Sequence, residues 1–290
     1  MSMVSMLSFM EKWSASFFAE YMGSTGTHYV ELVPSFVLGP SWHEGMVLAS
    51  ENYQDMIKFF TSRFSVLSIQ SLLFGVDIQL GSIPSHLSPL ESRFQALSTL
   101  GRQLGCSRFI LGSPSSRRLV GQQPVESAED AFLENCSLMA SYLDPDQILS
   151  LEHNTFHQGA EFMNTLESIH HVVRQLRRNG IQNVGINLDT KCVLNQFGPD
   201  CDLGIILSEG IRESISSIQV SYDFLKLSNS SAGARNLLAV SQIAQENSIA
   251  VSLEEYGLRL SDSSHYVSLF REYFDCDRGS FCGGSATHVL

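Results

Sequence analysis

Positive charge is scarce in this chain, which has 290 residues, 18 lysines and arginines, 30 aspartates and glutamates, and a formal net charge of −12. An acidic surface repels phosphate backbones, so we expect no nucleic-acid partner. Long hydrophobic runs are also missing, and no stretch is apolar over the length that a membrane span needs, so we expect no membrane association. The apolar first residues lack a basic flank and a small-residue cleavage site, which argues against a secretory signal.

Paired cysteine motifs are absent as well. The six cysteines form no CxxC pair and stand in apolar or mixed surroundings. Free thiols in a reducing compartment are therefore the better interpretation, and we expect a cytoplasmic protein. The sequence also has no internal repeat, heptad array or low-complexity block.

Eight short runs rich in Val, Ile and Leu alternate with amphipathic helical stretches. Such runs are typical of parallel strands that are buried on both faces. Eight strand–helix units in a chain of this length predict an α/β protein, a single (β/α)₈ TIM barrel. The expected strands are 4–8, 29–33, 65–69, 108–111, 148–152, 184–188, 217–220 and 250–254. The expected helices include 90–104, 128–142, 166–178, 234–246 and 264–274.

A doubly wound open sheet is the alternative architecture. It would call for a glycine-rich first turn such as GxGxxG, which the chain lacks. No shift in composition marks a domain boundary. We therefore expect one barrel over residues 1–277 and a flexible Gly/Ser-rich tail over residues 278–290.

Polar, oxygen-bearing residues stand where the last four predicted strands end, and they are Glu152, Asp189, Gln219 and Glu254. The active sites of TIM barrels lie at these strand ends, so we expect the four residues to share one site. Three carboxylates at one point repel one another and lose hydration, and a divalent cation is the simplest resolution. A shell made only of oxygen atoms suits Mn²⁺ or Mg²⁺ better than Zn²⁺.

Two other arrangements of these carboxylates stay open. Glu152 and Glu254 could pair with basic side chains and leave a metal-free relic, for which the candidates are Arg117, Arg118 and Lys191. A nearby histidine could instead join the metal, for which the candidates are His153 and His157.

Three further segments carry a resemblance to a known family. Residues 31–35 (ELVPS) are similar to an ExxPT segment, residues 70–75 (QSLLFG) to a QALLFG segment, and residues 111–117 (LGSPSSR) to an FGSPxxR loop. These segments follow the second, third and fourth predicted strands, as they do in the xylose isomerase-like TIM-barrel superfamily. The chain resembles in particular the sugar phosphate isomerase/epimerase branch of that superfamily, over residues 3–275.

The resemblance extends to the metal ligands of the family, which are Glu, Asp, His and Glu. Glu152, Asp189 and Glu254 match these residues. Gln219 stands where the family has His, and the family segment HISEP reads QVSYD here. The resemblance thus implies a divalent metal held by Glu152, Asp189, Gln219 and Glu254.

The activity that the resemblance implies is a metal-dependent isomerisation or epimerisation of a small keto-sugar, polyol or related hydroxy-carbonyl compound. Glu152 and Glu254 would be the catalytic residues and would exchange a proton through a metal-stabilised enediolate. A lyase, a dehydratase or another biosynthetic enzyme on the same scaffold is the nearest alternative. A non-catalytic, metal-free binding barrel is another, and the missing His ligand favours it. Barrels of this kind often form homodimers.

Candidates for binding the substrate lie near the same strand ends, and they are Trp42, Arg117, His153, Asn154 and Lys191. Arg117 follows a Gly/Ser loop and could hold a phosphate or carboxylate, or it could be a solvated cation. His153 and Asn154 could bond substrate hydroxyls. Trp42 could form an aromatic wall or simply pack in the core.

Lys191 and Cys192 raise two covalent alternatives. A lysine at the end of the sixth strand could form a Schiff base, although such a lysine is more often a solvated cation or a partner of carboxylates. A thiol nucleophile at Cys192 is not favoured, because nothing in the sequence orders a Cys–His pair.

Overall fold

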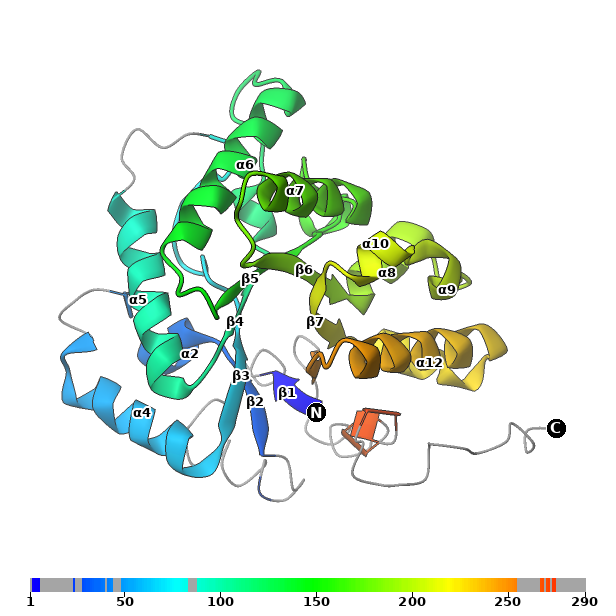
Figure 1. Cartoon of the computed structure of the whole chain (residues 1–290), viewed down its shortest axis with the longest axis horizontal. Helices are drawn as coiled ribbons and strands as arrows, with labels where there is room; N and C mark the ends of the chain where they lie inside the picture. Colours follow the sequence, from blue (N-terminus) through cyan, green and yellow to red (C-terminus); the bar gives the residue numbers. More distant parts are fainter. Residues whose placement is uncertain are drawn as a thin grey trace.

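A computed structural model describes residues 2–5, 23, 28–39, 41–43, 48–82, 88–254, 267–268, 270–271 and 273–274. Eight parallel strands follow one another around a closed barrel, and β1 pairs with both β2 and β8 (Figure 1). The strands are β1 (Ser2–Ser5), β2 (Tyr29–Leu32), β3 (Ser65–Ile69), β4 (Arg108–Leu111), β5 (Ile148–Glu152), β6 (Val184–Asp189), β7 (Ile215–Val220) and β8 (Val251–Leu253). The prediction of a (β/α)₈ TIM barrel is confirmed.

Helices surround the barrel on its outer side (Figure 1). The longer ones are α4 (Glu51–Arg63), α5 (Ser88–Leu104), α6 (Val125–Ser141), α7 (Leu166–Arg178), α8 (Thr190–Phe197) and α12 (Ser231–Glu246). The shorter ones are α2 (Pro34–Leu38), α9 (Leu203–Ile206), α10 (Glu209–Arg212) and α11 (Tyr222–Lys226), with 3₁₀ turns η2 (Pro114–Ser116), η3 (Phe156–Gln158) and η4 (Leu227–Asn229). Among the described residues, no helix has the length and apolar character of a bilayer span.

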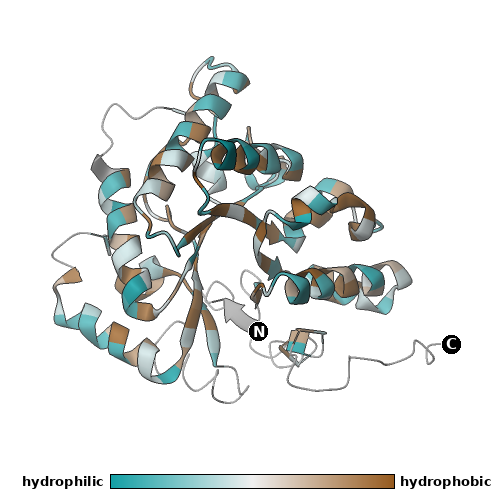
Figure 2. Ribbon diagram, in the orientation of Figure 1, coloured by the Kyte–Doolittle hydropathy of each residue, from teal (hydrophilic) through white to brown (hydrophobic). Residues whose placement is uncertain are grey.

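Helix α7 shows how the sequence specifies these elements. Its side chains at helical spacing, from Leu166 to Leu176, are buried against the barrel, and its outer face is hydrophilic (Figure 2). Thr165 caps the first turn by accepting a hydrogen bond from the backbone N–H of Ser168, and Arg177 and Arg178 stand in the last turn. This helix begins and ends where the sequence predicted.

The strand registers place polar residues side by side at the C-terminal mouth of the barrel. Glu152 lies opposite Asn187 in the β5–β6 pair, and Asp189 lies opposite Gln219 in the β6–β7 pair. Glu31, on β2, lies opposite Ser68 in the β2–β3 pair. Parallel strands end at the same edge, so these side chains share one region of the molecule. The predicted tail over residues 278–290 and parts of the predicted helix over 264–274 lie outside the described residues.

Candidate active site

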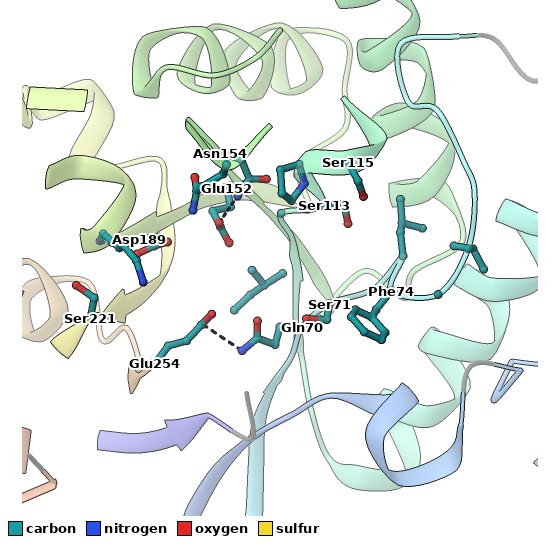
Figure 3. Close-up of a pocket in the computed structure, with 18 of the residues that line it drawn as sticks. Gln70, Ser71, Phe74, Ser113, Ser115, Glu152, Asn154, Asp189, Ser221 and Glu254 are labelled. Atoms are coloured by element: carbon teal, nitrogen blue, oxygen red, sulfur yellow. Dashed lines mark hydrogen bonds between the residues drawn. The ribbon is translucent and has the colours of Figure 1, made fainter. Parts of the chain in front are cut away.

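A pocket of about 830 Å³ opens at the C-terminal end of the barrel (Figure 3). Glu152, Asp189 and Glu254, the three predicted carboxylates, all line it. Glu152 and Glu254 enter the pocket from opposite sides, at the ends of β5 and β8 (Figure 3). The predicted substrate-binding residues Asn154 and Lys191 also line this pocket. The structure thus brings together the residues on which the sequence analysis placed the chemistry.

Burial and mutual repulsion favour the protonated forms of these carboxylates. Burial, followed by the nearby charge of Asp189, raises the pKa of Glu152 to about 8. Burial and then the charge of Glu31 raise the pKa of Glu254 well above its ordinary value, and burial also raises the pKa of Asp189. Without a cation, the site therefore holds protons near neutral pH.

Glu31 is a fourth carboxylate at the mouth, and the sequence analysis did not assign it to the site. It is fully buried and accepts a hydrogen bond from the Ser68 hydroxyl at 2.6 Å. Its Oε1 atom also accepts from the side-chain amides of Gln70, at 2.6 Å, and Gln219, at 3.0 Å. The same two amides donate to Oε2 of Glu254. The buried Glu31 carboxylate and the partly buried Glu254 carboxylate are therefore bridged by two shared amide donors.

Gln219 uses both ends of its amide within the protein. Its Nε2 atom donates to Glu31 and Glu254, and its Oε1 atom accepts from Nδ2 of Asn187. The side chain is 1% exposed and does not line the pocket. As the metal ligand that was predicted, Gln219 would have only the second lone pair of its Oε1 atom to offer, because Asn187 uses the first.

Cys192 joins the carboxylates because of how α8 begins. Asp189 caps this helix by accepting a hydrogen bond from the backbone N–H of Lys191 at 2.7 Å. The first turn then places the Cys192 sulfur 3.0 Å from Oδ2 of Asp189 and 3.8 Å from Oε1 of Glu152. Ligand atoms of these three residues all lie within 4.8 Å of one another. Burial and the two carboxylates raise the pKa of the Cys192 thiol.

Arg117 and Trp42 lie away from the pocket, so the structure does not support the substrate contacts that were predicted for them. Arg117 is fully buried and donates to the backbone carbonyls of Leu111, Gly112 and Met163. Trp42 is also fully buried, with the Arg93 guanidinium 5.0 Å from its ring centroid. Neither side chain lines the pocket, and both pack inside the protein.

His153 is also turned away from the pocket. Successive residues of a strand point to opposite sides, and Glu152 takes the inner position. The imidazole is fully buried, and this burial lowers its pKa to about 4, so it is neutral at pH 7. Asn154 faces the pocket again, and its Nδ2 atom donates to Oε1 of Glu152.

Comparisons with known proteins give matches to solved structures only. No family profile and no curated protein matches the sequence. A 3-keto-D-glucoside 4-epimerase from E. coli matches with a TM-score of 0.66 and 12% identity, covering 95% of this chain and 99% of the epimerase. A family 2 AP endonuclease from Brucella melitensis matches with a TM-score of 0.65 and 17% identity, covering 94% and 99% of the two chains.

The IolI protein, solved with a bound zinc atom, matches with a TM-score of 0.60 and 16% identity, covering 94% of this chain and 99% of IolI. Other matching structures include D-psicose 3-epimerase and a probable 3-DHS dehydratase. At these identities the similarity is one of fold. The chain has the fold of the xylose isomerase-like TIM barrels.

Proposed function

We propose that the protein is a metal-dependent isomerase or epimerase of a small hydroxy-carbonyl compound. The observation that carries this proposal is the convergence of Glu152, Asp189 and Glu254 on one pocket. Lys191 is the one basic residue among the described residues that line it. A cluster with this excess of negative charge suits a divalent cation, and Glu152, Asp189 and Glu254 would hold it.

Two local features of the structure fit a bound cation. The Oδ1 atom of Asn154 is buried beside Glu152 and has no hydrogen-bond donor, which leaves an oxygen available to a cation or to its water. Gly112 provides the room that the Glu152 carboxylate occupies, because a Cβ atom at position 112 would lie 3.0 Å from Oε2. The zinc found in IolI, which shares the fold, also supports the assignment.

Proton transfer is the task that suits the two glutamates. Isomerisation removes a proton from the carbon next to a carbonyl and returns it to the neighbouring carbon or to the opposite face. Glu152 and Glu254 reach the pocket from opposite sides, so one can take the proton and the other can deliver it (Figure 3). A divalent cation, when bound, would polarise the substrate carbonyl.

The surrounding amides hold both glutamates in position for this transfer. Asn154 donates to one oxygen of Glu152, and Asn187 donates to the other at 3.4 Å. Glu254 is held through Oε2 by Gln70 and Gln219. These bonds fix the positions of the two carboxylates at the mouth of the barrel.

The lining of the pocket indicates the kind of substrate. Polar groups at the carboxylate end face an apolar wall of Leu73, Phe74 and Val76, and Phe74 is 47% exposed. A neutral polyhydroxy carbonyl compound suits the polar end, and this proposal is in keeping with the sugar epimerases that share the fold. The net charge of −12 argues against DNA as a substrate, although an AP endonuclease has the same fold.

Solvent deuterium exchange tests the proposed reaction. The protein is loaded with Mn²⁺, Co²⁺ or Zn²⁺ and incubated in D₂O with a panel of keto-sugars and hydroxy ketones. NMR should then show deuterium at the carbon next to the carbonyl, and Glu254→Gln should abolish this exchange. A product that has lost water would instead indicate a dehydratase. If no compound in the panel exchanges its proton, the proposed reaction is wrong for these substrates.

A further inference from the structure

We propose that Cys192 adds a thiolate ligand to the metal shell, so that the ion is held by Cys192 together with Glu152, Asp189 and Glu254 and the site selects zinc or cobalt over magnesium. This inference rests on the metal site proposed above, but it differs from the shell predicted from the sequence. That shell used Gln219 and contained only oxygen atoms.

The surroundings of the Cys192 sulfur carry the first part of the argument. The side chain is fully buried, and its sulfur lies 3.0 Å from Oδ2 of Asp189, 3.2 Å from Oε1 of Gln158 and 3.8 Å from Oε1 of Glu152. A thiol has one proton and can donate it to only one of these three oxygens. The Gln158 oxygen already accepts hydrogen bonds from the backbone N–H and the hydroxyl of Thr155. A divalent cation would bind the sulfur and the two carboxylates at once, and the thiol proton would then leave to solvent.

An independent observation at the same place is the unpartnered oxygen of Asn154. This side chain is 2% exposed, lines the pocket and has no donor for its Oδ1 atom. The Nδ2 atom of the same amide donates to Oε1 of Glu152, so this side chain contacts one member of the cluster. A buried carbonyl oxygen without a donor is costly, and a cation or a water bound to it removes that cost.

Gln219 is poorly placed to be the fourth ligand. Its oxygen accepts from Asn187, and its nitrogen bridges Glu31 and Glu254. Apart from Glu254, the donor atoms available to the ion therefore lie on the β5, β6 and α8 side of the mouth. Sulfur is a ligand that Zn²⁺ accepts readily, whereas Mg²⁺ requires hard oxygen ligands. The proposed thiolate shell therefore favours Zn²⁺ or Co²⁺ over the Mn²⁺ or Mg²⁺ predicted from the sequence.

Cobalt spectroscopy tests the ligand directly and does not depend on activity. Co²⁺ is added to the metal-free protein, and the near-ultraviolet thiolate-to-cobalt charge-transfer band is recorded. We expect the band in the wild type, its loss in Cys192→Ser, and its retention in the matched control Cys201→Ser. Cys201 is a partly exposed thiol that does not line the pocket.

X-ray absorption of the zinc-loaded protein provides the second measurement. We expect one sulfur at about 2.3 Å from the zinc. The same signal is expected in C201S/C276S/C282S, which keeps Cys192, so the test stands even if Cys192→Ser does not fold. This variant also keeps Cys106 and Cys136, which are buried and do not line the pocket. One bound ion per chain with only nitrogen and oxygen neighbours would overturn the thiolate ligand and leave the proposed function in place. A protein that binds no ion would overturn both.

Discussion

Glu31 and Glu254 accept hydrogen bonds from the same two side-chain amides, those of Gln70 and Gln219. The two amides lie after β3 and on β7, whereas the two carboxylates lie on β2 and just after β8. This arrangement connects four strands around the mouth of the barrel. It also gives Gln219 a task that a histidine ligand could not perform in the same way, because one NH₂ group serves two carboxylates.

Substitution of Gln219 by Glu tests this bridge. The change removes both donors and adds another carboxylate beside Glu31 and Glu254. We expect it to lower the free energy of unfolding at about pH 8 by about 3 kcal/mol or more. At about pH 5 the new carboxyl group can hold a proton and donate again, so the loss should be much smaller. Urea denaturation at both pH values measures this.

The matched control for that substitution is Gln242→Glu, on the exposed face of α12. It should change the free energy of unfolding by less than about 0.5 kcal/mol at either pH. An equal loss for Gln219→Glu at both pH values would show that the bridge acts through shape and not through charge.

The fold was predictable because each strand carries its own local signal. The runs at 65–69, 108–111 and 148–152 coincide with β3, β4 and β5, because short apolar segments that alternate with helices are typical of buried parallel strands. The barrel then brings Glu152, Asp189 and Glu254 together, as the sequence analysis expected. The strand ends specify their common position because parallel strands end at one edge.

The remaining site residues depend on contacts that no local pattern records. Glu31 is bridged to Glu254 only once β1 pairs with β8 and closes the barrel. The sequence does not favour Cys192 as a nucleophile, because no His is ordered beside it. The usable signal was the helix that starts directly after Asp189, which places positions 189 and 192 on one face. The sequence places Arg117 on a loop, where it could bind an anion, but in the structure its guanidinium donates to three backbone carbonyls.

The stability of the metal-free protein should fall as the pH rises. Burial raises the pKa of Glu152 to about 8 in the folded state. The unfolded chain has the ordinary, lower value, so the folded state binds more protons between the two values. The free energy of unfolding should therefore decrease from about pH 5 to about pH 8. Glu254 contributes with the same sign.

Thermal melts in the presence of a chelator measure this dependence. Glu152→Gln removes one of the titrating groups and should flatten the decrease across the same pH range. A melting temperature that rises with pH, or an unchanged slope in Glu152→Gln, would mean that this carboxyl group is not protonated in the folded protein.

Gly112→Ala should weaken the metal site without unfolding the barrel. The added Cβ atom would lie 3.0 Å from Oε2 of Glu152, so the carboxylate must move. We expect metal affinity to fall by about tenfold or more, with a change in stability below about 1 kcal/mol. Isothermal titration and melting curves measure the two effects. Gly210→Ala is the control, since the nearest atom to its added Cβ would be 3.8 Å away. Unchanged metal affinity in Gly112→Ala would contradict the assignment of Glu152 as a metal ligand.

Arg117→Lys separates a structural role from a substrate-binding role. An ammonium group cannot reproduce the guanidinium bonds to Leu111, Gly112 and Met163. We expect the free energy of unfolding to fall by about 2 to 4 kcal/mol, because buried carbonyls lose their donors. The KM of the folded fraction should not change. The control is Arg118→Lys, at an exposed position, which should leave the free energy of unfolding and the KM unaltered. A raised KM with normal stability in Arg117→Lys would instead support the substrate-binding interpretation.

Metal content tests the central claim most directly. The purified protein is supplied with Zn²⁺, Co²⁺ or Mn²⁺, dialysed and subjected to elemental analysis beside the double variant E152Q/E254Q. The three carboxylates that line the pocket predict about one divalent ion per chain in the wild type and its loss in the variant. If neither protein retains an ion, the carboxylates of this barrel do not form a metal site.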